Sequence, residues 1–187
     1  MSTRIKGQAR IAFPKLFEAE AFPGTSNKKY GAAFLIPKGS DLEKQIEKAI
    51  EAEAQAKYGK VWQKTLASVK GNNNKCCWQD GDLSKYESNE GHMILSSGRQ
   101  EKDGRPTVLD RDKTALEEAD GRIYAGCYVN FNVDIWAQDG QYTGIRCSLN
   151  GVQFVKDGDA FGGAARVSDD EFDDLGVDES EEADDLA

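Results

Sequence analysis

The chain has 187 residues, of which 39% are hydrophobic, and a formal net charge of −9. This is enough material for one domain with a substantial core and too little for two comfortable domains. No apolar run approaches the ~20 residues that a membrane-spanning helix needs, and the first residues, MSTRIKGQAR, lack the apolar stretch of a signal peptide, so we expect a cytoplasmic protein.

The negative charge is concentrated at the C-terminus. Residues 168–187 hold eleven of the 33 acidic residues and no lysine or arginine, which leaves 22 acidic against 24 basic residues in the rest of the chain. Such a run predicts a solvated, disordered tail. A mildly basic body joined to an acidic tail indicates that the body binds another polyanion.

Two strands are predicted near the N-terminus. Residues 4–13 alternate between a basic face and a core face, and residues 29–36 form a second strand that ends at Pro37. The basic face carries Arg4, Lys6, Gln8 and Arg10. The core faces carry Ile5, Gly7, Ala9, Ile11 and Phe13 in the first strand, and Tyr30, Ala32, Phe34 and Ile36 in the second.

Two helices are predicted after the second strand. The first runs from a capping box at Ser40 and Glu43 to Gly59, because apolar residues between them recur at helical spacing. A short second helix over residues 60–69 places Val61 and Trp62 near one stripe, with Trp62 as a core anchor.

The second half of the chain predicts strands. Short strands are expected at residues 76–79, 92–96 and 107–109, and a long strand at residues 122–137. In the long strand apolar residues alternate with polar and aromatic ones, so one face belongs to the core and the other is polar.

The long strand and the segment after it predict a β-hairpin. A two-residue turn would mix core and polar residues, whereas a three-residue loop at residues 138–140, with Gly140 in the left-handed conformation, keeps them apart. The expected pairs are Val133 with Ile145, Phe131 with Cys147, Val129 with Leu149, Trp136 with Tyr142, Asn132 with Arg146 and Tyr128 with Asn150.

The open face of this hairpin carries aromatic rings interleaved with cations. A single-strand binder requires this pattern, because every base offers a π-face and every phosphate a charge. The alternative is that the helices cover the face and the rings belong to the edge of the core. The candidate ssDNA-binding residues are Lys29, Tyr30, Lys75, Lys85, Tyr86, Arg122, Tyr124, Tyr128, Trp136, Tyr142 and Arg146.

Two segments and the acidic end carry a family resemblance. The strand AGCYVNFNVDIW (residues 125–136) and the segment GIRCSLNGVQFVKDGDAFGG (residues 144–163) resemble bacteriophage single-stranded DNA-binding proteins with an OB fold. Weaker cues are WQDGD, GHMILSS and RPTVLD. The chain departs from the usual OB order because its helices follow the second strand instead of joining the third and fourth, and its tail lacks the terminal aromatic residue of some relatives.

The resemblance implies a mainly β protein with a helical insertion (α+β). It would comprise an OB-fold-like β-barrel at residues 1–158, followed by a flexible linker and acidic tail at residues 159–187. It implies ssDNA binding without sequence preference during replication, recombination or repair, in the cytoplasm of the infected bacterial host. It leaves a monomer or a homodimer open.

The resemblance also implies that the tail contacts replication and recombination proteins, such as a polymerase or a helicase. Single apolar residues among the acids, including Phe172, are suited to docking on a partner. The alternative is a tail that serves only solubility. The candidate partner-binding residues are Asp169, Asp170, Glu171, Phe172, Asp173, Asp174, Glu181, Glu182, Asp184 and Asp185.

Two rival classes remain: a metal-dependent nuclease, and an acidic interaction module without affinity for nucleic acid. A nuclease would need carboxylates to hold a metal ion, and the candidates lie in turns, where such side chains commonly bond the local backbone. They are Asp80, Asp82, Asp103, Asp110 and Asp112. The sequence has no motif of a nucleotide-binding enzyme or of a metalloenzyme. The cysteines and His92 lack the spacing of zinc ligands, so we expect the cysteines to be reduced structural thiols. We therefore expect a protein that has no cofactor and is not an enzyme. The cysteines are Cys76, Cys77, Cys127 and Cys147.

Overall fold

The computed structural model describes residues 1–21 and 23–161. The acidic tail, with its candidate partner-binding residues between 169 and 185, therefore lies outside the described residues. No helix in the described part is long and apolar enough to cross a membrane.

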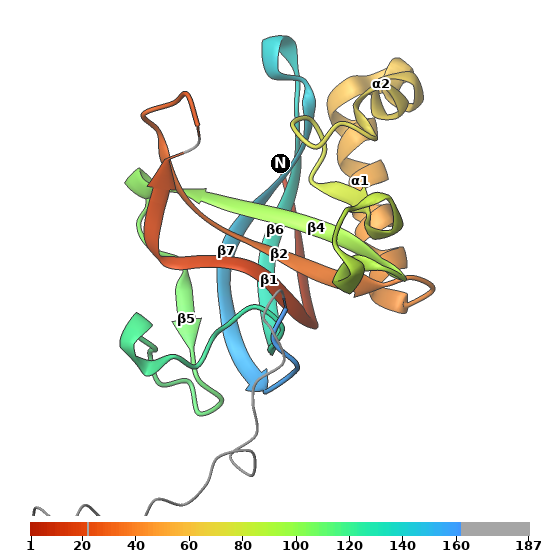
Figure 1. Cartoon of the computed structure of the whole chain (residues 1–187). Helices are drawn as coiled ribbons and strands as arrows, with labels where there is room; N and C mark the ends of the chain where they lie inside the picture. Colours follow the sequence, from red (N-terminus) through yellow and green to blue (C-terminus); the bar gives the residue numbers. More distant parts are fainter. Residues whose placement is uncertain (22, 162–187) are drawn as a thin grey trace, which may run out of the picture.

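Five strands close into a barrel (Figure 1). They are β1 (Thr3–Ala21), β2 (Lys28–Pro37), β4 (His92–Gln100), β6 (Tyr128–Gln138) and β7 (Gly144–Lys156). Neighbours pair in the order β1, β2, β4, β7, β6 and back to β1, and all pairs are antiparallel except β4 with β7. A closed five-strand barrel with this connectivity is an OB fold, which confirms the predicted fold class.

Two short strands extend the sheet at its edges. β3 (Trp78–Asp80) pairs with β4, and β5 (Thr107–Leu109) runs parallel to β7. The barrel itself is closed between β4 and β7 by one residue pair, Gly98 with Ser148. This seam is much shorter than the other strand pairings of the barrel.

The helices α1 (Asp41–Tyr58) and α2 (Trp62–Val69) follow β2, as predicted, with a single 3-10 turn (Gly59–Val61) between them. The Ser40 hydroxyl accepts the Glu43 N–H, and the Glu43 carboxylate accepts the Gly39 N–H one residue before the cap. Buried residues of α1 pack on the barrel, so the helices cover one side of it (Figure 1). Val61 is 59% exposed, which contradicts its predicted place on the apolar stripe, and Trp62 is half-buried against the core.

The core fills the barrel with the residues that strand alternation predicts. Phe34 and Phe131 stack at 4.5 Å between ring centroids, and Ile11, Leu95 and Ile145 are fully buried. The four cysteines are free and buried, as predicted. Burial raises the pKa of the Cys76 thiol to about 11, so it stays protonated and unreactive near neutral pH.

The long strand begins later than predicted. β6 starts at Tyr128 rather than at residue 122, because residues 125–127 form a turn in which Gly126 has a φ of +110°. A Cβ at Gly126 would lie 2.1 Å from the carbonyl oxygen of Asp159. Residues 122–127 therefore do not extend the strand, although they alternate in the sequence. They lie where the chain before β6 passes close to the backbone that follows β7.

The predicted hairpin register is wrong by four residues. Val133 pairs with Leu149 rather than Ile145, and Trp136 pairs with Arg146 rather than Tyr142. The connection spans residues 139–143 and contains a 3-10 turn (Gly140–Tyr142), although Gly140 does have a positive φ of +78°. Because a shift of four is even, Val133, Trp136, Arg146 and Leu149 keep their predicted faces.

The other expected pairs shift further, by five residues for Asn132, Phe131 and Val129 and by six for Tyr128. A bulge between Asn132 and Val133 adds a further shift below the hairpin tip. The observed pairs are Ile135 with Cys147, Asn132 with Gly151, Phe131 with Val152, Val129 with Phe154 and Tyr128 with Lys156.

Phe13 does not lie on the core face. Ala12 pairs with Ala33 and Lys15 pairs with Gly31, so two residues of β1, Phe13 and Pro14, oppose one residue of β2. Phe13 has a φ of +48° and its side chain is 55% exposed. A β-bulge turns a side chain out of the alternation, which the sequence pattern did not reveal.

Candidate nucleic-acid interface

Two hairpins extend beyond one end of the barrel (Figure 1), and β4 pairs with one strand of each, β2 and β7. One joins β1 to β2 and the other joins β6 to β7. Between them lies a cleft of about 620 Å³ that is lined by both hairpins and by β4. The short seam between β4 and β7 opens into this cleft, since Gly98 and Ser148 both line it.

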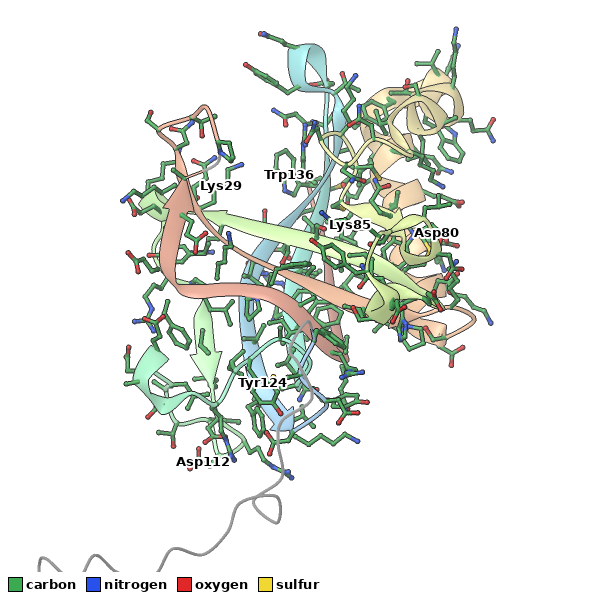
Figure 2. The ribbon with its side chains drawn as sticks, viewed as in Figure 1. Lys29, Asp80, Lys85, Asp112, Tyr124 and Trp136 are labelled. Carbon is green, nitrogen blue, oxygen red and sulfur yellow. The ribbon has the colours of Figure 1, made fainter. Side chains whose placement is uncertain are left out.

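Four of the eleven candidate ssDNA-binding residues line the cleft: Lys29, Tyr30, Trp136 and Arg146. Lys29 and Trp136 come from opposite hairpins (Figure 2). The Trp136 Nε1–H donates to the Ser148 hydroxyl at 3.0 Å, which holds the half-buried ring in place. Tyr30 is 9% exposed and belongs mainly to the mouth of the core.

The cleft has an excess of positive charge. Its lining includes the cations Lys15, Lys29, Arg99 and Arg146 and the anions Glu20 and Asp103. The guanidinium of Arg146 donates to the carbonyl oxygens of Asn74 and Tyr142 at 2.6 and 3.1 Å, and that of Arg99 donates to the carbonyl oxygens of Asp103 and Gly104. Carbonyls orient these groups without neutralising them, so their charge acts on the cleft.

Four more candidates lie next to the cleft. Tyr142 is 63% exposed at the tip of the β6–β7 hairpin, and the carbonyl of Lys75 accepts the Ile145 N–H at the base of the same hairpin. The ring of Tyr86 contacts Phe13, a residue that lines the cleft, and the Lys85 ammonium lies 5.2 Å from the Tyr86 ring.

The remaining three candidates, Arg122, Tyr124 and Tyr128, lie at the opposite end of the barrel, where Figure 2 shows Tyr124. The Tyr124 hydroxyl bonds Asp157 and the backbone of Gly158. The Arg122 guanidinium lies over the Phe154 ring, and the Lys156 ammonium lies over Tyr128. The structure therefore does not gather the tyrosines of the predicted hairpin face into one site.

These residues hold the end of the described chain on the barrel. The Arg10 guanidinium donates to the carbonyl oxygens of Gly126 and Asp159, and lies 4.2 Å from the centroid of the Phe161 ring. The Phe161 N–H bonds the Ala125 carbonyl at 3.0 Å. The chain thus stays packed against the barrel three residues past the predicted boundary at residue 158.

Among the aromatic and cationic residues that line the cleft, sequence reasoning missed Phe13, Lys15 and Arg99. The predicted strands ended at residues 13 and 96, whereas β1 and β4 continue to Ala21 and Gln100. Residues 96–100, SSGRQ, include no apolar side chain, so the second half of β4 shows no alternation in the sequence. The bulge at Phe13 leaves no sequence signal either.

The basic face of β1 lies outside the cleft. Arg4 forms a bidentate pair with Asp134, with nitrogen to oxygen distances of 2.9 and 3.1 Å, and this pair lowers the pKa of the Asp134 carboxyl. Lys6 and Gln8 line a separate hollow of about 650 Å³ together with Asn130 and Asn150. The interleaved asparagines are therefore on an outer, wet surface.

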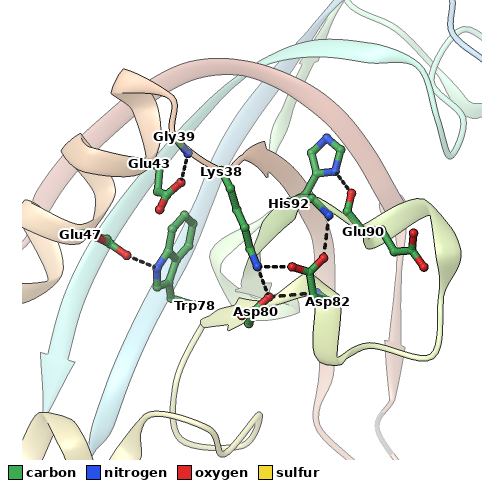
Figure 3. A network of polar contacts seen from close by, with 10 residues as sticks. Lys38, Gly39, Glu43, Glu47, Trp78, Asp80, Asp82, Glu90 and His92 are labelled. Carbon is green, nitrogen blue, oxygen red and sulfur yellow. Dashed lines mark hydrogen bonds and ion pairs between the residues drawn. The ribbon is translucent and has the colours of Figure 1, made fainter.

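The carboxylates that a nuclease would need have other partners. The Lys38 ammonium lies 2.5 Å from both Asp80 and Asp82, and these bonds lower the pKa of each carboxyl (Figure 3). Asp110 pairs with Arg122, and Asp112 accepts the Thr114 N–H. Within residues 1–21 and 23–161, no group of three or more His, Cys, Asp or Glu side chains is arranged to hold a metal ion.

An OB barrel with a basic, aromatic cleft between its two hairpins defines an oligonucleotide-binding protein. The sequence matches the family described as Enterobacter phage Enc34, ssDNA-binding protein, over residues 3–186, and the chain belongs to this family. The family consists of DNA-binding proteins and not of enzymes, in agreement with the prediction from the sequence.

Relatives support the same assignment. Protein p50 of Acyrthosiphon pisum secondary endosymbiont phage 1 is 42% identical over 175 residues, which cover 92% of this chain and 94% of that protein. The single-stranded DNA-binding protein from bacteriophage Enc34, solved in complex with ssDNA, is 27% identical with a TM-score of 0.70, covering 85% of this chain and 89% of its own. The gp2.5 protein of bacteriophage T7 shares the fold, with 14% identity, a TM-score of 0.54 and coverage of 95% and 98%.

Proposed function

We propose that this protein binds single-stranded DNA, without sequence specificity, in the cleft between the β1–β2 and β6–β7 hairpins. The observation that carries the proposal is the cleft itself, which combines the oriented indole of Trp136 with the guanidinium groups of Arg99 and Arg146, both held by carbonyl oxygens. OB folds bind oligonucleotides with the loops that join strands 1 to 2 and 4 to 5, and these are the two hairpins here. The Enc34 relative solved with ssDNA supports the proposal.

In this proposal the two kinds of side chain have separate roles. Bases stack on Trp136, which is sequence-tolerant because every base has a π-face. Phosphates follow Lys29, Arg99 and Arg146, whose attraction depends on charge and not on base identity. Together these contacts coat a strand without selecting its sequence.

The test is a fluorescence-anisotropy titration of labelled oligothymidylate against duplex of equal length, with and without EDTA. We expect preference for the single strand and no effect of EDTA. Equal affinity for duplex would overturn the proposal, and metal-dependent shortening of the label would favour the nuclease.

We further propose that the protein coats ssDNA during replication, recombination or repair in the cytoplasm of the infected bacterial host. The acidic residues 168–187 would recruit a polymerase, a helicase or another protein of these processes. Support comes from their composition, eleven acids with interspersed apolar residues, and from the family. Pull-down of host and phage proteins with the full chain and with a chain truncated after Arg166 tests this role.

A further inference from the structure

Phe13 is placed unfavourably in two ways that do not serve the fold. Its backbone has a φ of +48°, in the left-handed region that costs a non-glycine residue roughly 1–2 kcal/mol. Its ring is 55% exposed, although the strand alternation offers it a core position. Strained residues of this kind persist where the surrounding structure enforces them, and they concentrate at ligand-binding sites.

The exposed ring has an exposed aromatic partner. Phe13 and Tyr86 meet edge to face with centroids 5.3 Å apart, and the Tyr86 side chain is 42% exposed. The Lys85 ammonium lies 5.2 Å from the Tyr86 ring. Two open rings and a cation from separate parts of the chain therefore form one patch, which we name the outer platform.

The loop that presents Tyr86 is held in place before any ligand binds. Asn89 is 6% exposed, and its amide donates to the Ser84 hydroxyl at 3.0 Å. Gly81 packs so closely that an added Cβ would lie 2.2 Å from the Asn89 carbonyl oxygen. At the base of the loop, Lys38 bonds Asp80 and Asp82 (Figure 3). Such preorganisation reduces the entropy lost on binding.

The outer platform continues the cleft. Phe13 lines the cleft together with Lys15, and its ring contacts Tyr86 outside it. A strand that leaves the cleft past Lys15 would reach Phe13 and then Tyr86, with Lys85 beside the next phosphate. Exposed aromatic rings next to a cation match the stacking and charge requirements of a nucleotide.

We propose that Phe13 and Tyr86 form a second base-stacking subsite, which extends the ssDNA-binding site from the cleft over the outer face of β1. This inference rests on the proposed function. The bulge at Phe13 exists to turn the ring outward to a base, and Lys85 contacts the adjacent phosphate.

The test compares oligothymidylates of about 4 and about 16 nucleotides, lengths that bracket the known site sizes of OB folds. In Phe13→Asn the new residue tolerates the left-handed conformation, so the thermal midpoint is maintained or raised while the ring is lost. We expect affinity for the long oligomer to fall about 5- to 150-fold, the equivalent of ~1–3 kcal/mol, and affinity for the short oligomer to stay at the parent value. Tyr86→Ala should act in the same direction.

Val61→Asn is the matched control, because Val61 is similarly exposed, at 59%, but lies in the turn between the helices. It should bind both lengths as the parent does. Parent affinity of Phe13→Asn and Tyr86→Ala for the long oligomer would overturn the second subsite, as would an equal loss at both lengths. If instead the parent itself shows no preference for single strands, the proposed function fails first.

Discussion

At the scale of single residues, Trp136 has the clearest expected role. It lines the cleft with its indole N–H held by Ser148, whereas Trp78 is 4% exposed and Trp62 lies on α2. Trp136→Ala should weaken ssDNA binding by about 1–3 kcal/mol, because one stacked base loses its partner. Anisotropy titration with oligothymidylate measures the change.

Two further variants separate the ring from its orientation. Ser148→Ala keeps the indole but removes its hydrogen-bond acceptor, and should weaken binding less than Trp136→Ala. In the parent, added DNA should quench the intrinsic tryptophan fluorescence. Trp136→Phe should abolish most of this quenching, since the other two tryptophans do not line the cleft. Quenching that persists in Trp136→Phe would place the bases elsewhere.

Arg146 is expected to contribute through counterion release. The logarithm of the binding constant should fall with the logarithm of salt concentration by about 0.7 for each phosphate contacted. Arg146→Gln should reduce the magnitude of this slope by roughly that amount if it contacts one phosphate. Arg4→Gln is the control, because Arg4 is paired with Asp134 outside the cleft. Equal slopes for the parent and Arg146→Gln would contradict the proposed phosphate path.

At the scale of elements, strand alternation predicted which face of the sheet a side chain occupies better than it predicted which residues pair across the hairpin. The residues of β6 and β7 that the predicted pairs assigned to a face do lie on that face, even though the register near the hairpin tip was wrong by four residues, because the period of a strand is two. The position of the hairpin connection depends on contacts from elsewhere in the chain. The Tyr58 hydroxyl, at the end of α1, lies 2.8 and 3.0 Å from the carbonyl oxygens of Gln138 and Gly144. A local pattern contains no information about that contact.

The turn at Gly126 and the segment after β7 depend on two glycines that approach backbone to backbone. A Cβ at Gly158 would lie 2.3 Å from the Gly126 carbonyl oxygen and 3.1 Å from the Tyr128 ring. Gly158→Ala should therefore destabilise the protein by about 1–3 kcal/mol, as overpacking does elsewhere. Thermal unfolding measures this effect.

Gly104→Ala is the matched control for that substitution. Gly104 has a φ of +80° and open space around it, so this variant carries backbone strain without a clash. It should be destabilised by about 1 kcal/mol, in line with the cost of a left-handed residue. Wild-type stability of Gly158→Ala would show that the segment at residues 157–161 can leave the barrel without loss.

At the scale of the whole molecule, the balance of charge predicts a competition between tail and DNA. The body carries a slight positive excess and residues 168–187 carry eleven acids. Truncation after Arg166 should tighten ssDNA binding, most at low salt, where charge is least screened. Anisotropy titrations at several salt concentrations test this. Unchanged affinity at every salt concentration would contradict the competition.

The sequence predicted the class of fold and protein better than the site. Composition, the capped helix and the two motif segments were sufficient for an OB barrel with an inserted pair of helices. The cleft was only partly predictable, because it is formed by two hairpins that are more than 100 residues apart in the chain, around Gly24 and Gly140. Tyr124 and Tyr128 looked like binding residues, yet their contacts hold Gly158 and Arg10.

The short seam between β4 and β7 has a consequence for how a strand enters. No strand pair within the described residues joins the tips of the two hairpins across the cleft. The opening is therefore lateral, a slot rather than a ring, and a nucleic acid does not need a free end to thread it. If the proposed function holds, closed circles and interior gaps of long molecules are ligands equivalent to linear strands, and a bound protein can leave the DNA sideways.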